Sequence, residues 1–195
     1  MPKLWSETIE AHRHAVQDAI LEQAAALVTK HGLTSVTMSQ IAEAAGIGRA
    51  TLYKYFPDVG TILSAWHESK ITSHLSVLRE TAESSGNAKE RLKSVLEAYA
   101  HLAHQKHSAE LATLLHDGAH VEYAHQHLRD MIARIIKEGV TTGTIRKDIA
   151  PKELALFCLH ALTAAESLNS KTAVGRLVNV ILSALSPEIG ASRRI

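Results

Sequence analysis

The chain has 195 residues, of which 46% are apolar and 21% charged, a balance typical of a globular protein with a buried core. Its formal net charge is +1, so bulk charge points to no partner, and its single cysteine excludes an internal disulfide framework and favours a reducing, cytoplasmic location. No stretch approaches the roughly 20 apolar residues that span a bilayer, so we expect no membrane partner.

Apolar residues recur at helical spacing in about nine segments, which predicts an all-α fold. The first predicted helix opens at Ser6, with Trp5 packing back as a hydrophobic staple, and ends at His31-Gly32. Two short helices follow, and a longer one begins after Pro57 and stops at a break over residues 84–87.

The second half of the chain predicts further helices. Residues 88 to about 117 form one or two helices, and the apolar spacing over 124–135 indicates another. Residues 143–151 form a long turn whose proline suits a helix start. Two final helices are expected over 152–168 and 173–186.

The stretch TMSQIAEAAGIGRATLYKYFPD, residues 37–58, contains both short helices. Thr37 is placed to cap the first of them, and Gln40 can reach back to complete a capping box. Gly46 supplies the left-handed conformation that ends this helix, and Gly48 caps the next. The spacing therefore predicts two short helices joined by a tight turn.

The second short helix has an inner and an outer face. Leu52 and Phe56 are four residues apart and are expected to hold it to the core. The outer face carries small side chains at its front and cationic or phenolic side chains at its rim. This arrangement is typical of a helix-turn-helix whose second helix enters the DNA major groove. The predicted DNA-binding residues are Thr37, Arg49, Ala50, Thr51, Tyr53, Lys54 and Tyr55.

Their chemistry suits two kinds of DNA contact. Arg49 can fork onto guanine, while Ala50 and the Thr51 methyl can meet a thymine methyl. Lys54, the two tyrosine hydroxyls and Thr37 are expected at phosphates. Residues 1–70 hold six Lys/Arg against seven Asp/Glu, so affinity must come from local placement rather than from a basic surface. The alternative, a helical hairpin with solvated charges, leaves two exposed tyrosines around a lysine unexplained.

Residues 34–63 resemble the DNA-binding signature of TetR-like (tetracycline-repressor-family) transcriptional regulators. The matching positions are Thr37 through Ile41, Ala45-Gly46-Ile47, Thr51-Leu52-Tyr53 and Tyr55-Phe56-Pro57. The sequence departs from many relatives at Gly48, where they carry serine, and at Val59, where they carry lysine.

This resemblance implies an N-terminal three-helix DNA-binding domain, residues 1–57, and a helical ligand-sensing and dimerisation domain, residues 58–195. It further implies a homodimeric, ligand-responsive regulator, most simply a repressor that a small molecule releases from a palindromic operator. Neither an enzymatic activity nor a cofactor is implied. An activator or a corepressor-dependent regulator of the same class fits the same sequence.

Histidines suggest the main alternative. Among the 13 are His101, His104 and His107, spaced three apart, and His116 and His120, spaced four apart. Two histidines on one helix face can bind zinc, which would suit a metal-dependent enzyme or a metal-binding or metal-sensing protein. The segment HDGAH, however, lacks the metalloprotease His-Glu-x-x-His pattern, so we predict no metal site.

We expect instead a mostly apolar cavity for an organic ligand, with a few polar groups at its wall. The predicted lining residues are Trp66, His101, His116, His120 and Phe157.

The two last helices are unusually apolar. The first is apolar almost all round, as expected of a helix buried on two sides. A core within one chain would account for this, but we favour a four-helix bundle across a two-fold axis, with Cys158 as a small buried hydrophobe. The predicted dimer-interface residues are Leu154, Cys158, Ala161, Leu162, Leu177, Val178, Ile181 and Leu182.

Overall fold

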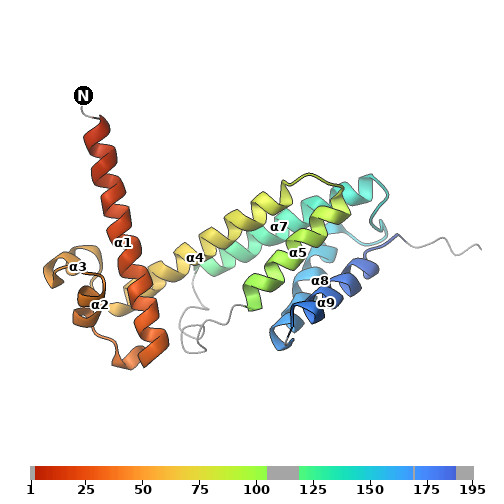
Figure 1. Ribbon diagram of the computed structural model, residues 1–195. Coiled ribbons are helices and arrows are strands. Elements are labelled where there is room, and N and C mark those ends of the chain that lie inside the picture. Colours follow the sequence, from red (N-terminus) through yellow and green to blue (C-terminus); the bar gives the residue numbers. More distant parts are fainter. Residues whose placement is uncertain (1–2, 105–118, 169, 188–195) are drawn as a thin grey trace, which may run out of the picture. The chain divides into compact units, whose positions relative to one another are not determined.

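The computed structural model describes residues 3–104, 119–168 and 170–187, and these contain eight α-helices, two short 3-10 helices and no strand (Figure 1). The all-α prediction is confirmed. The part of the predicted 88–117 helical region beyond His104 lies outside the described residues. In the described part of the chain, no helix is both long and apolar enough to cross a membrane.

The chain divides into two compact units, whose described parts are residues 3–71 and residues 72–104 with 119–187. The first contains α1 (Lys3–His31), η1 (Leu33–Ser35), α2 (Met38–Ala44), α3 (Arg49–Tyr55) and the start of α4 (Val59–Ala82). The second contains the rest of α4, α5 (Ala88–His104), α7 (Ala119–Thr141), α8 (Pro151–Leu162), η2 (Thr163–Ser167) and α9 (Lys171–Ala184). The first unit thus extends past residue 57 into α4, and the predicted domain boundary there stays a prediction.

Three predicted helix ends are wrong. Helix α1 begins at Lys3, and no residue between there and Ser6 disfavours a helix, so Trp5 lies inside the helix and not at the position before its start. Helix α8 stops at Leu162 and continues as 3-10 turns, where the Thr163 hydroxyl donates to the His160 carbonyl at 2.8 Å. Helix α9 begins two residues early because the Ser170 hydroxyl accepts from the backbone N–H of Ala173.

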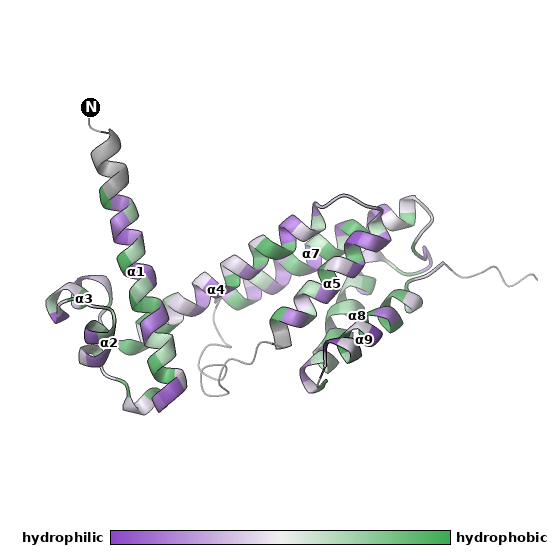
Figure 2. Ribbon diagram, in the orientation of Figure 1, coloured by the Kyte–Doolittle hydropathy of each residue, from purple (hydrophilic) through white to green (hydrophobic). Residues whose placement is uncertain are grey.

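The core of the first unit lies where α1, α2, α3 and α4 meet. Along α4, hydrophobic and hydrophilic residues alternate with a helical repeat, as Figure 2 shows. The α4 side chains Ile62, Leu63 and Trp66 pack into this core. One turn further, Lys70 Nζ lies 2.8 Å from a carboxylate oxygen of Glu22 on α1 and 5.8 Å from the centre of the Trp66 ring.

The second unit is built around α5, which contacts α7 and α9, while α8 packs on α7 (Figure 1). Leu92, Leu96, Ile132 and Ile136 are fully buried in its core. Arg91 fastens the end of α4: its guanidinium donates to the Ala82 carbonyl at 3.2 Å and forms an ion pair with Glu138 on α7.

The predicted interface residues of α8 and α9 largely face inward. Leu154, Cys158, Leu162, Val178, Ile181 and Leu182 are all buried within the chain's own core, and Ala161 and Leu177 are partly exposed. The large apolar side chains that these helices leave exposed are Leu156, Phe157 and Val180, none of which belongs to the predicted set.

Gly139 marks the tightest approach inside the second unit. A Cβ added there would lie 2.5 Å from Cδ1 and 3.2 Å from Cβ of the buried Ile145. A Gly139→Ala change should therefore destabilise the fold by about 1–3 kcal/mol through overpacking, although alanine is the better helix former. The matched control is Gly175→Ala in α9, where nothing lies within 4 Å, and which should stabilise by about 0.5–1 kcal/mol. Urea unfolding of both variants checks this, and two stabilising changes would contradict it.

Candidate nucleic-acid interface

Helix α2 is fixed by the predicted capping box. The backbone N–H of Gln40 donates to the Thr37 hydroxyl at 3.4 Å, and the N–H of Thr37 donates to the Gln40 side-chain oxygen at 2.8 Å. The Thr37 hydroxyl also donates to that oxygen at 2.9 Å. The hydroxyl proton that we expected at a phosphate is thus engaged within the box, and the DNA-contacting role of Thr37 stays a prediction.

The turn after α2 has the predicted backbone. Gly46 has a φ of 67°, in the left-handed region, and its N–H donates to the Glu43 carbonyl at 3.1 Å. The next N–H, that of Ile47, returns to the Ala42 carbonyl at 3.0 Å, and the Ile47 side chain packs against the first core. Gly48 then caps α3 from an extended conformation. These bonds set α3 against α2 with little freedom.

Helix α3 turns one face inward and the other outward. Leu52 is fully buried and Phe56 is 6% exposed, so both hold the helix to the core as predicted. On the outer face, Arg49, Ala50, Thr51 and Lys54 are exposed and Tyr53 is 52% exposed.

Tyr55 differs from the other predicted contact residues. Its side chain is half-buried and packs against the core of the first unit. The remaining five residues of α3 in the predicted set therefore form one exposed face, with small side chains beside two cations, as major-groove reading requires.

Asp58 fixes the start of α4, directly after the helix-turn-helix. Its carboxylate caps α4 by accepting from the backbone N–H of Thr61 at 2.7 Å and from the Thr61 hydroxyl at 3.0 Å. These bonds, the backbone one first, lower the pKa of Asp58 below its usual range. An aspartate three residues before a threonine at a helix start is the signal that identifies such a cap.

The left-handed turn allows a direct test of the helix-turn-helix backbone. Gly46→Ala should destabilise the first unit by about 1–2 kcal/mol, since an L side chain is strained at this φ even though no atom lies within 4 Å. Gly48→Ser is the control, because its backbone is extended and serine is a good N-cap. Thermal unfolding followed by circular dichroism measures the stability of both variants. If Gly46→Ala is no more destabilising than Gly48→Ser, the left-handed conformation of Gly46 does not matter for stability.

The predicted ligand-lining residues are spread over several elements. Trp66 is 7% exposed in the core of the first unit, and Phe157 is 45% exposed on α8. His101 on α5 and His120 on α7 are half-buried, and His116 lies outside the described residues. These assignments stay predictions.

The described side chains include histidines and one cysteine, the residue types that could bind a metal or react as a thiol. Within residues 3–104, 119–168 and 170–187, no group of three or more His, Cys, Asp or Glu side chains is placed to hold a metal ion. His104, His107 and His116 lie outside the described side chains. Burial raises the pKa of Cys158 to about 12, which keeps the thiol neutral, as expected of a small buried hydrophobe.

The N-terminal region of the chain is similar in sequence to known regulatory proteins. Residues 20–64 match the family described as bacterial regulatory proteins, tetR family. An uncharacterized HTH-type transcriptional regulator of Mycobacterium bovis is 33% identical over 81 residues, which cover 42% of this chain and only 41% of that relative.

Solved structures extend the likeness to most of the chain. A transcriptional regulator of the TetR/AcrR family from Thermobifida fusca is 18% identical with a TM-score of 0.75, over 85% of this chain and 96% of that one. The regulator FadR from Bacillus subtilis, solved in complex with stearoyl-CoA, is 19% identical with a TM-score of 0.64, over 86% and 96% of the two chains. At these identities the likeness shows a shared fold.

Proposed function

Because the chain belongs to the tetR family of bacterial regulatory proteins, we propose that it is a ligand-responsive, sequence-specific DNA-binding regulator. In this proposal it acts as a homodimeric repressor on a palindromic operator in the cytoplasm, and a small molecule releases it. The family is one of transcriptional regulators, which are not usually enzymes, and the metal-dependent alternative has no support among the described residues.

The outer face of α3 is the observation that carries the proposal. Arg49 stands in its first turn with its side chain exposed, beside Ala50 and Thr51, whose small side chains allow close approach to base edges. Leu52 anchors the opposite side of the same helix in the core. A rigidly mounted helix with a forked cation at its front suits direct reading of a guanine in the major groove.

Dimerisation supplies the second half of the contact. The side of α8 that the single chain leaves at least partly exposed carries Phe157 and Ala161, and the following η2 carries Ala164. On α9 the corresponding residues are Leu177 and Val180, and Ala161 and Leu177 also touch the core. These form an apolar stripe on each helix, with alanines that permit close helix approach. We place the two-fold interface on these stripes, rather than on the buried side chains that the apolar pattern first suggested.

A ligand releases the protein from DNA only if the ligand binds better to another arrangement of the second unit. Helix α4 is the segment that carries such a change along the chain, because its first half belongs to the core of the first unit and its second half to the second unit. The ligand itself is proposed only as an organic small molecule. Acyl-CoA thioesters belong in a first screen, since FadR was solved with stearoyl-CoA.

Selection of bound fragments from the organism's genomic DNA tests the proposal. The full-length protein should enrich a few sites that share an inverted repeat. Recovery of genomic fragments without any shared site enriched over the input DNA would reject sequence-specific regulation.

Lys54 should act differently from Arg49. Its exposed position in the last turn of α3 suits a phosphate, so Lys54→Ala should weaken all DNA sequences alike. The slope of log affinity against log salt should fall by about 1 per half-site, because one phosphate contact is lost. Titrations at several salt concentrations measure this, with Lys152→Ala on α8 as the control that keeps the slope. A loss confined to the operator sequence would argue against this role.

A further inference from the structure

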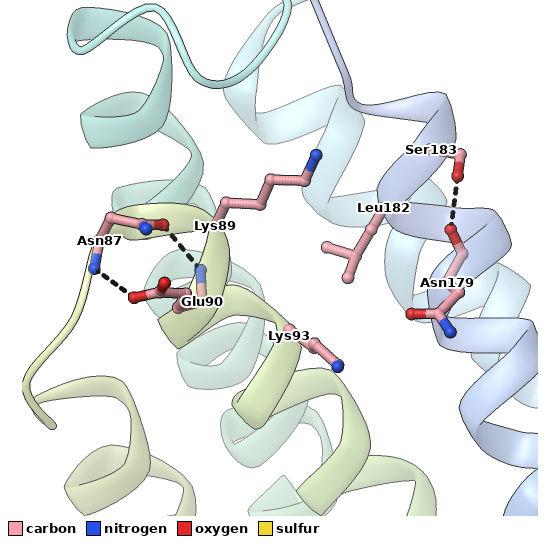
Figure 3. Close-up of a pocket in the computed structure, with 7 residues that line it drawn as sticks. All are labelled: Asn87, Lys89, Glu90, Lys93, Asn179, Leu182 and Ser183. Carbon is pink, nitrogen blue, oxygen red and sulfur yellow. Dashed lines mark hydrogen bonds between the residues drawn. The ribbon is translucent and has the colours of Figure 1, made fainter.

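A groove of about 480 Å³ opens in the second unit between the start of α5 and the end of α9 (Figure 3). Lys89 and Lys93 line it from α5, and Asn179 and Ser183 line it from α9. Leu182, which is 6% exposed, lies between the two lysine side chains, and both lysines extend from α5 toward α9 (Figure 3). The groove is thus a concave surface with an apolar floor and polar walls.

The two lysines have a neutral hydroxyl and a distant carboxylate as their partners. They stand at i and i+4 on one helix, where like charges destabilise each other. Lys89 Nζ donates to the Ser186 hydroxyl at 3.2 Å, a neutral partner. Lys93 Nζ lies 3.9 Å from the Glu97 carboxylate, at the far limit of an ion pair, and its side chain is 49% exposed.

The carboxylate that lines the groove is that of Glu90, and it caps the start of α5. Glu90 accepts from the backbone N–H of Asn87 at 3.0 Å, and the Asn87 side-chain oxygen accepts from the N–H of Glu90 at 3.0 Å (Figure 3). This reciprocal cap holds the start of α5 and fixes one oxygen of the Glu90 carboxylate, so the lining holds one negative charge beside the two lysine charges. Helix α9 contains no Asp or Glu, so its wall adds no further negative charge.

We propose that this groove binds a small molecule carrying a phosphate group between Lys89 and Lys93. Lys89 and Lys93 stand one helical turn apart on α5, so their flexible side chains can turn toward the oxygens of one such anion, and the Asn179 amide offers donors from the opposite wall. The volume lies in the range of small-molecule sites, and the Leu182 floor accommodates an apolar part of the ligand. The site goes beyond the proposed operator and inducer sites, and a bound anion would join α5 to α9.

Thermal unfolding of the full chain tests the proposal, with inorganic phosphate, pyrophosphate and glycerol 2-phosphate as probes, each compared with sodium chloride of equal ionic strength. At ligand concentrations about tenfold above the dissociation constant, the midpoint should rise by about 3 °C over the chloride reference. The Lys89→Met, Lys93→Met double variant should lose this rise. The matched control, Lys152→Met with Lys171→Met, removes two exposed lysines outside the groove and should keep it.

The three probes also separate the sources of the phosphate. A lysine-dependent rise with inorganic phosphate supports a free anion, and one seen only with glycerol 2-phosphate supports an ester. The proposal is overturned if no probe exceeds chloride, or if the groove double variant keeps the full response. Circular dichroism at 222 nm verifies that both double variants are folded.

Discussion

A Phe157→Glu, Val180→Glu double variant should sediment as a monomer of about 21 kDa and lose operator binding, whereas the wild-type chain should sediment as a dimer. Phe157 is 45% exposed and Val180 is 67% exposed, so neither change disturbs the core of a single chain. In the dimer, each glutamate would be buried without a partner, at a cost of several kcal/mol per ion, and two-fold symmetry doubles that cost. A single half-site then offers too few phosphate contacts at physiological salt.

The matched control places the same charges on a different face of the second unit. Val77 on α4 is 47% exposed and Tyr123 on α7 is 62% exposed. A Val77→Glu, Tyr123→Glu variant should remain dimeric and bind the operator. If both double variants stay dimeric, the interface lies elsewhere, and if the wild type is monomeric at micromolar concentration, the dimer proposal fails.

Arg49→Ala should abolish discrimination at one base position in each half-site. A bidentate arginine–guanine contact is worth about 1–3 kcal/mol of discrimination, and the symmetric operator contains it twice. Stability should change little, because the side chain is exposed in the first turn of α3. Sequence selection followed by titration of single-base operator variants measures the effect.

Arg49→Lys distinguishes base reading from charge at this position. Lysine keeps the positive charge but lacks the guanidinium fork, so the salt slope should be retained while base preference weakens. Arg13→Ala, which removes an exposed arginine from α1, is the control and should leave the preference unchanged. An unaltered base preference in Arg49→Ala would assign this residue to the phosphates.

The helix-turn-helix was the most predictable part of the fold because its signals are local. The Thr37–Gln40 capping box and the left-handed Gly46 depend on residues within one or two helical turns, and both are present as predicted. The inward faces of Leu52 and Phe56 also follow from spacing alone. Tyr55 was less predictable, because a tyrosine can present its hydroxyl outward while its ring packs on the core.

The apolar helices α8 and α9 show where sequence patterns lose information. A helix that is apolar on most sides does not indicate which side packs inside the chain and which faces a partner. The predicted interface includes Leu162 and Leu182, which the single chain buries, whereas the interface that we propose contains Phe157 and Val180, which it leaves exposed. Both assignments stay predictions. The groove lysines, likewise, face α9 only because distant segments pack together.

A hydroxyl-radical footprint of the wild-type protein on a genomic fragment that it selects tests directly whether it reads its operator as a dimer. A dimer that reads a palindromic operator should protect two segments related by a two-fold axis, with centres one helical turn or a multiple of it apart. Arg49→Ala should lose discrimination at one base position in each segment. Protection without a symmetric pair of segments, or protection equally strong on unrelated DNA, would contradict a dimeric reader of specific operators.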